Sequence, residues 1–314
     1  MSEQFARVAT HEAERRVATH EAERRVAMHE AERRVAMIRI AIAATITALL
    51  LLAPRSARGQ DWHETSYARQ VSGESDLAVK IEYGAGKLDI APAAPGTLYR
   101  ANLRYDADAF TPEVSYANNR LRFGMESGSV RGRNLKEGRL DLRLSPDVPL
   151  ELELAFGATD ATVELGGLLV RHVNIKTGAS RTVVSVASPN EEECRMFEVE
   201  VGAASFEARN LGNLNAPRFA LRGGVGEVIL DFTGTWQQDM NAGVEMGLGT
   251  LTLRLPRGLG VRIVKDGLLA SFDSQGLTKR GDVYYSENYE DTTRKLSLDL
   301  DAALGSIRVE WVDP

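Results

Sequence analysis

The sequence predicts an all-β fold, specifically a single-stranded β-solenoid in which short strands stack coil upon coil. Three observations support this fold class. Apolar and polar residues alternate with a period of two in many short segments, glycine recurs at intervals of 21 to 24 residues, and helical patterns are almost absent. With 43% hydrophobic and 26% charged residues, the chain of 314 residues can bury a core of its own.

Residues 1–36 contain a tandem nine-residue repeat, RVATHEAER, that begins at Arg7. Nine residues advance a helix by about two and a half turns, so the valines of successive copies fall on alternating sides and form no continuous apolar face. A recent gene duplication upstream of the true start explains the near-identical copies better than a structural requirement does. We therefore expect translation to start at Met28 or Met37.

Residues 37–59 have the layout of a signal peptide, with Arg39 followed by the apolar run Ile40–Ala53 and then Pro54. Small residues at the end of this segment predict a signal helix that is cleaved between Gly59 and Gln60. As a helix, the apolar run would span about 21 Å, against about 30 Å of bilayer hydrocarbon, so an uncleaved single-pass anchor is the weaker alternative. The segment predicts export to the periplasm or the cell surface, with membrane contact only where it is left uncleaved.

Residues 60–76 are polar and show no regular period, which predicts a linker, and strands follow it. In the segment LELELAF the leucines and Phe156 share one face while Glu151 and Glu153 share the other, as a half-buried strand requires. The predicted strands are Ala78–Tyr83, Leu98–Tyr105, Arg120–Phe123, Arg139–Leu144, Leu150–Phe156, Phe197–Val201, Glu227–Phe232, Thr250–Leu255 and Lys295–Asp301.

Glycine follows the end of a strand at regular intervals, and a second apolar strand comes after it each time. Two short strands and two turns fit a coil of about 22 residues, in which glycine supplies positive φ at the corners. The predicted turn glycines are Gly84, Gly86, Gly157, Gly178, Gly202, Gly224, Gly247 and Gly305. Turn signals 8–12 residues apart also fit an antiparallel β-sandwich, which stays open as the alternative.

Three longer loops interrupt the coils, and loops on a rigid scaffold are common binding sites. The loops are Gly124–Gly138, Ala187–Arg195 and Asp273–Asp291. The last loop holds Tyr284, Tyr285 and Tyr289, which either form an aromatic surface for a glycan or peptide or cover the end of the stack. The run Glu191–Glu193 indicates a solvated turn.

Catalytic motifs are missing from this sequence. His63 and His172 have no GxSxG nucleophile to serve, and the glycine strings at 84–86 and 223–226 complete neither a dinucleotide nor a phosphate loop. Three carboxylate pairs could serve a glycosidase, but alternating acids are also what a solvated strand shows. These pairs are Glu151 with Glu153, Glu198 with Glu200, and Asp299 with Asp301. We predict no catalytic residues, and hence not an enzyme.

Composition narrows the range of partners further. The lone Cys194 excludes a disulfide framework and is expected to be a buried apolar residue, and no Cys/His spacing predicts a metal site. Residues 60–314 hold 28 Lys and Arg against 37 Asp and Glu, a formal charge of −9. A nucleic-acid partner is therefore not expected, and neither is a cofactor.

The segment DLAVKIEYGAGKLDIAPAAPGTLYRANLRYD resembles the N-terminal toast-rack domain of bacterial envelope proteins. The later coils, which end in KLSLDLDAALGSIRVEW, are similar to the "putative adhesin" repeats and to the C-terminal domain of LiaF, the cell-wall-active antibiotics response protein. The resemblance implies a toast-rack-like domain at 77–165 and an adhesin/LiaF-like domain at 166–314. It also implies a right-handed solenoid outside the cytoplasmic membrane, without defined catalytic residues.

Together these observations predict an exported, non-enzymatic protein of the cell envelope whose solenoid surface serves adhesion or scaffolding. The expected partner is an envelope polymer or an envelope protein. Two alternatives remain: envelope-stress sensing, as the likeness to LiaF implies, and a carbohydrate-active enzyme built on a β-helix.

Overall fold

The computed structural model describes residues 61–127, 138–266 and 269–313. In this part of the chain nearly all regular structure is β, with one short 3-10 helix at Leu211–Leu214. The predicted signal segment, its cleavage site at Gly59 and Gln60, and most of the loop Gly124–Gly138 lie outside the described residues. Residues 59–314 form one compact unit, which contains all the described strands.

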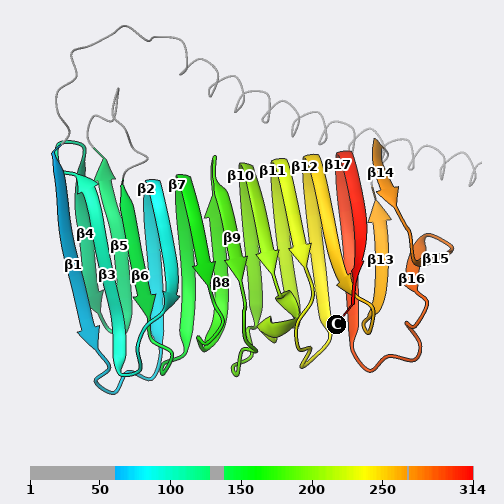
Figure 1. Cartoon of the computed structure of the whole chain (residues 1–314), viewed down its shortest axis with the longest axis horizontal. Helices are drawn as coiled ribbons and strands as arrows, with labels where there is room; N and C mark the ends of the chain where they lie inside the picture. Colours follow the sequence, from blue (N-terminus) through cyan, green and yellow to red (C-terminus); the bar gives the residue numbers. More distant parts are fainter. Residues whose placement is uncertain (1–60, 128–137, 267–268, 314) are drawn as a thin grey trace, which may run out of the picture. The chain divides into compact units, whose positions relative to one another are not determined.

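The middle of this unit is a ladder of parallel strands (Figure 1). Its members are β7 (Leu150–Glu164), β8 (Val170–Thr177), β9 (Arg181–Ser185), β10 (Met196–Arg209), β11 (Arg218–Asp231) and β12 (Met240–Pro256). Leu152 pairs with Val173, Val173 with Phe197, Phe197 with Phe219, and Phe219 with Ala242. These offsets of 21, 24, 22 and 23 residues equal the glycine intervals of the sequence. The coil period of a β-solenoid is confirmed, and the antiparallel sandwich is wrong for these coils because their pairing is parallel.

Each long strand belongs to two sheets because it bends near its middle. The first half of β10 pairs with β8, from Met196 to Val201, and its second half pairs with β9, from Ser205 to Arg209. The first halves thus build one sheet, called the first sheet here, and the second halves build the second sheet. Gly does not end these strands as predicted, because the backbone pairing continues on both sides of the bend.

The core lies between the two sheets, and the burial pattern shifts by one residue at every bend. In β7, Leu150, Leu152 and Leu154 are buried before the bend, whereas Ala161 and Val163 are buried after it. In a strand without a bend, every second residue would stay buried along the whole strand, because side chains alternate between the two faces. The shift turns the second half of each strand inward again, so that both halves contribute to one core.

The N-terminal end of the stack does not follow chain order. β2 (Leu77–Pro92) lies between β7 and a coil made of β5 (Arg120–Ser127) and β6 (Arg139–Leu144). β4 (Phe110–Ala117) pairs antiparallel with β5, and β3 (Thr97–Asp106) with β6. Here the two sheets are extended by hairpin strands rather than by further coils.

The prediction of a linker at 60–76 is wrong over most of its length, since β1 (Trp62–Gln70) pairs antiparallel with β3. Of the residues of β1, only Trp62, Thr65 and Tyr67 are half-buried, so the strand packs weakly on one side. An edge strand of this kind carries little apolar alternation, which is why its sequence shows no regular period.

At the C-terminal end of the stack, too, the strand order departs from the chain order. β17 (Lys295–Val312) lies between β12 and a last coil of β13 (Gly260–Asp266) and β14 (Leu269–Asp273). β16 (Val283–Ser286) pairs with β13, and β15 (Leu277–Arg280) pairs with β16. The predicted loop 273–291 is therefore largely a hairpin at the end of the first sheet.

The predicted domain boundary between residues 165 and 166 is not a break in the structure. β7, which ends at Glu164, pairs along its first half with β8 and along its second half with β9. The two predicted domains, 77–165 and 166–314, share one continuous core. The reason is that every coil buries its apolar side chains against the next coil, so no coil interface differs from the others.

Several of the predicted turn glycines are needed at the bends for a reason other than the predicted positive φ. Of the eight, only Gly86 and Gly305 have positive φ. Gly226 and Gly249 also have positive φ, although they were not among the predicted turn glycines. Gly157, Gly202, Gly224 and Gly247 lie at the bend because neighbouring coils approach too closely for a side chain, whereas the approach is looser at Gly178 and nothing lies within 4 Å of a Cβ on Gly84. A Cβ on Gly247 would lie 2.6 Å from the carbonyl oxygen of Gly224, for example. The same contact recurs from coil to coil along Gly84, Gly157, Gly178, Gly202, Gly224 and Gly247.

Candidate functional site

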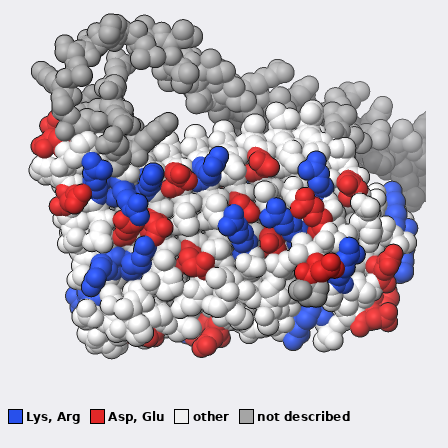
Figure 2. Space-filling view, viewed as in Figure 1, with Lys and Arg blue, Asp and Glu red and all other residues white. Residues whose placement is uncertain are grey.

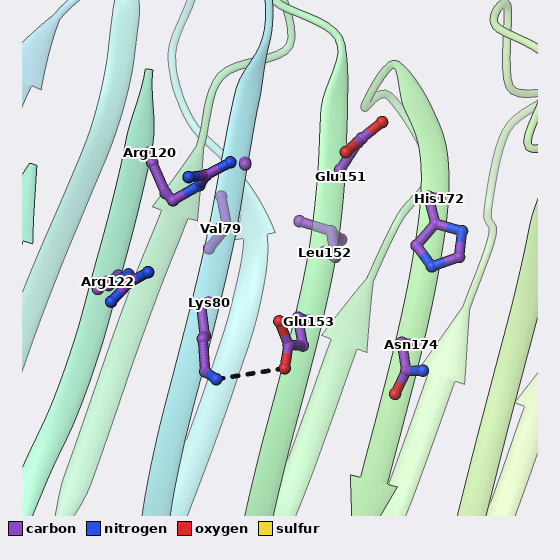
Figure 3. A pocket seen from close by; sticks show the side chains of 10 residues that line it. Val79, Lys80, Arg120, Arg122, Glu151, Leu152, Glu153, His172 and Asn174 are labelled. Carbon is purple, nitrogen blue, oxygen red and sulfur yellow. Dashed lines mark ion pairs between the residues drawn. The ribbon is translucent and has the colours of Figure 1, made fainter. Parts of the chain in front are cut away.

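A groove of about 410 Å³ lies on the outer face of the first sheet, over β5, β2, β7 and β8 (Figure 3). Its walls are long polar and charged side chains, and its floor is the sheet itself. The lining residues are Ala78, Val79, Lys80, Arg120, Arg122, Glu151, Leu152, Glu153, His172 and Asn174. Because the groove is open and is built on paired strands, it offers a rigid surface rather than an enclosed reaction chamber.

Strand register explains why the surface is hollow at this point. Arg120, Ala78, Glu151 and His172 lie side by side in one row across the four strands. Directly paired residues on neighbouring strands point to the same face. Ala78 is the only short side chain in this row, so the space above it stays open between longer neighbours.

The carboxylates in the groove form ion pairs with basic neighbours. Lys80 Nζ lies 3.3 Å from Glu153 Oε1 and 3.1 Å from Glu82 Oε1, and Arg195 contacts Glu151 at 2.5 Å. The hydrogen bonds from Lys80 to Glu82 and Glu153 raise the pKa of the lysine above its usual range. Lys80 therefore stays charged beside these two glutamates.

Two cations in the groove lack such a partner. Among the described residues, neither Arg120 nor Arg122 has an acidic group within ion-pair distance. Figure 3 shows both guanidinium groups directed from β5 towards β2, that is, into the groove. Their donors are available to a bound molecule.

The opposite side of the groove is polar, and the cation beside it, Arg195, contacts Glu151. His172 lies next to Glu151, and Asn174 Nδ2 donates to Glu198 Oε2 over 3.4 Å. The Oδ1 atom of Asn174 is buried and accepts no hydrogen bond from any described residue. A buried amide oxygen without a donor is uncommon in folded proteins. Because this oxygen is buried, the acceptors that this side offers to a ligand are the carboxylates of Glu151 and Glu153.

The other predicted carboxylate pairs also lie on the first sheet, and they do not form paired acids. Glu200 contacts Lys176 at 3.3 Å, Glu198 accepts from Asn174, and Asp299 lies 3.9 Å from Arg262. Figure 2 shows basic and acidic side chains interspersed over the visible face, without a large patch of either sign. These acids thus take part in cross-strand polar contacts.

The tyrosines of the last loop lie on the end hairpin. The Tyr284 ring is 4.8 Å from the Phe272 ring and packs on the core, while the Tyr285 and Tyr289 rings are 5.0 Å apart. In the loop Ala187–Arg195, Glu192 pairs with Arg171 at 3.0 Å, so the acidic run is only in part a solvated turn. Cys194 is fully buried, as the sequence predicts.

The predictions did not single out Arg120, Arg122 or Lys80, although all three stand on outward positions of predicted strands. They were missed because β5 pairs with β2, although two other strands separate β2 from β5 in the chain. A sequence signal does exist in RLRF and AVKI, where the basic residues occupy the polar positions. It gives no indication that the two segments are neighbours.

Within the described ranges, no group of three or more His, Cys, Asp or Glu side chains could hold a metal ion. No helix of the described part is long and apolar enough to cross a bilayer.

The sequence of the first coils decides the family. Residues 57–208 match the family described as the N-terminal domain of toast_rack, DUF2154. This stretch is a toast-rack N-terminal domain. The toast-rack domain runs from β1 to β10 and includes the whole groove, and it extends past the boundary predicted at residue 165. The likeness to LiaF stays a prediction.

Solved structures with low sequence identity also align with the chain. One is a "putative cell adhesion protein" from Clostridium sporogenes, 18% identical, covering 80% of this chain and 100% of its own, with a TM-score of 0.42. Another is a "putative adhesin" from Bacteroides fragilis, 14% identical, covering 79% and 97%, with a TM-score of 0.40. A "putative lipid binding protein" from Parabacteroides distasonis is 9% identical, covering 80% and 97%, with a TM-score of 0.36. A search of curated proteins gives no match.

Proposed function

We propose that this protein is an exported, non-enzymatic binding protein of the cell envelope, and that the groove on its first sheet is a ligand site for adhesion or scaffolding. Export is supported by the signal-peptide layout of residues 37–59. The toast-rack domain, which the resemblance to envelope proteins led us to expect, supports a role in the envelope.

The observation that carries this proposal is that the groove carboxylates form ion pairs with basic side chains. Hydrolysis of a glycoside needs one protonated and one ionised carboxyl group facing the scissile bond. Glu151 and Glu153 stand on one strand and are neutralised by Arg195 and Lys80. Such a surface can hold a ligand through hydrogen bonds and charge, but it provides no acid and base pair. Binding therefore explains the groove better than turnover does.

The location is tested by expressing the full chain with a C-terminal tag and measuring the intact mass of the protein in each cell fraction. We expect a form that begins at Gln60, outside the cytoplasm. A cytoplasmic form that retains residues 37–59 would contradict export. A membrane-bound form that keeps the apolar run would support a single-pass anchor instead.

The binding role is tested with the exported protein and isolated cell-envelope material. We expect saturable retention, while an unrelated acidic protein of equal size is washed away. Incubation with a panel of polysaccharides should release no reducing ends. Equal retention of the two proteins would contradict the binding role, and release of reducing ends that disappears in Glu151→Gln would contradict the non-enzymatic role.

A further inference from the structure

We propose that Arg120 and Arg122 are the anion-binding side of the groove, and that the ligand is an acidic polysaccharide whose carboxylate or phosphate groups they hold. This inference rests on the proposed function, because it names the ligand class of the same site. It is carried by the pairing of β5 with β2, by the space above Ala78 and by the acceptor groups of the opposite side.

The strand register places two like charges side by side. Arg122 lies directly opposite Lys80, and their side chains share the outer face of the sheet. Like charges directly opposite each other destabilise a sheet. Lys80 also contacts Glu153 and Glu82, whereas Arg122 has no acid within ion-pair distance among the described residues. Two other cations on this face do have one: Lys176 lies 3.3 Å from Glu200, and Arg222 lies 3.6 Å from Glu245. An anion bound at the groove would relieve the repulsion between Arg122 and Lys80.

The two arginines are spaced so that both can contact one ligand. Arg120 and Arg122 are two residues apart on one strand, so their Cα atoms are separated by about 6.8 Å and both side chains point to the same face. A guanidinium group binds a carboxylate or phosphate through two parallel hydrogen bonds. The space above Ala78 admits the ligand next to Arg120, and Arg122 can contact the same ligand one step further along the strand.

The acceptor groups on the opposite side of the groove favour a polysaccharide over other polyanions. Beyond the arginines the groove presents the carboxylates of Glu151 and Glu153, which can accept hydrogen bonds from a ligand while each also contacts a cation. A nucleic acid or an anionic membrane would bring further phosphates against these carboxylates, on a mature chain of formal charge −9. Sugar hydroxyl groups donate to such acceptors. The groove therefore suits a molecule with an anionic group at one end and hydroxyl groups at the other.

The experiment compares the exported protein with Arg120→Gln/Arg122→Gln in direct binding to three polymers of similar length. Polygalacturonate carries carboxylates, phosphomannan carries phosphates, and dextran is neutral. We expect binding to at least one of the two anionic polymers, none to dextran, and a loss of at least tenfold in affinity in the double variant. The polymer that binds identifies which of the two anions the site takes.

The matched control is Arg181→Gln/Arg308→Gln, which removes two positive charges from exposed positions on the second sheet that have no ion pair among the described residues. We expect this variant to bind as the parent does. An equal loss in both variants would show a net-charge effect and overturn the proposal, as would unchanged binding in the groove variant. Circular dichroism checks that each variant is folded.

Failure of this inference differs from failure of the proposed function. If the parent and the groove variant are retained equally by envelope material, the binding role stands and the anion site is wrong. If the parent binds no envelope material and no polymer, both are wrong. Binding of single-stranded DNA as tight as binding of the acidic polymers would also overturn the ligand class.

Discussion

Gly249 of β12 stacks in register on Gly226 of β11, and the carbonyl oxygen of Gly226 occupies the space that a Cβ on Gly249 would need. Both residues have positive φ, at 149° and 146°. Gly305 of β17 continues the contact onto Gly249. The bend of three successive coils thus depends on residues that lack a side chain.

Gly249→Ala should therefore destabilise the fold by about 2 kcal/mol or more, since it adds both a steric clash and an unfavourable φ. Gly243→Ala is the matched control on the same strand, because nothing lies within 4 Å of a Cβ there and its φ is not positive. We expect the control to change the free energy of unfolding by about 0.5 kcal/mol or less. Urea unfolding measures both, and equal losses would contradict the role of the bend.

The exposed apolar side chains at the same bend should contribute little to stability. Val225, Leu248 and Leu304 lie next to one another on β11, β12 and β17, with 43%, 46% and 50% of their surfaces exposed. We expect Leu248→Ser to leave the unfolding midpoint almost unchanged and to lower the binding of a hydrophobic dye. The buried Leu253 of the same strand is the comparison. Leu253→Ala should cost about 2 to 5 kcal/mol.

Cys194 should be inert in the folded protein. Burial raises the pKa of its thiol from 9.0 to about 12, so the reactive thiolate is scarce at neutral pH. A thiol reagent at pH 8 should label the protein only after denaturation. Because the folded pKa is the higher one, this thiol favours the fold below pH 9, and its contribution falls between pH 9 and about 12. Rapid labelling of native protein would contradict this.

Glu74 should stabilise the fold at neutral pH and lose this effect in acid. Its carboxylate accepts hydrogen bonds from the backbone N–H of Ser72, from the Ser72 hydroxyl and from Tyr116, which together lower its pKa from 4.5 to about 2. The stabilisation is present above pH 4.5 and declines as the pH falls towards 2.

We therefore expect Glu74→Gln to make the unfolding midpoint less dependent on pH between 4.5 and 2. Glu287→Gln, at an exposed carboxyl without an ion pair among the described residues, serves as the control and should follow the parent. A parallel pH dependence in the parent and Glu74→Gln would contradict the prediction.

The central coils could be predicted from the sequence because each coil contacts only its neighbours in the chain. The glycine interval from Gly202 to Gly224 is 22 residues, and so is the register of Phe197 with Phe219. Local periodicity and tertiary pairing carry the same information in such a stack. The predicted strands fall on observed ones, apart from Phe232 at the end of one of them, and the observed strands extend further through the bends.

The two ends and the groove could not be predicted in this way. The groove needs β5 next to β2, and two other strands separate these in the chain. The alternation that marks Arg122 and Lys80 as outward residues says nothing about which strand lies opposite. β1 was missed because weak burial leaves an edge strand without an apolar face. Sequence periodicity thus shows which residues face outward, but it does not show which strands pair when they are distant in the chain.

The placement of β2 and β17 limits how such a protein can change in length over evolution. β2 has partners on both edges, in β5 and β6 on one side and β7 on the other, and β17 lies between β12 and the coil of β13 and β14. A repeat joined after β17 would find no open edge on that strand. New coils can join the stack by insertion between existing coils, where the strands of neighbouring coils pair parallel and in register. Duplications inside the gene, rather than at its ends, are the route by which relatives with longer stacks would arise.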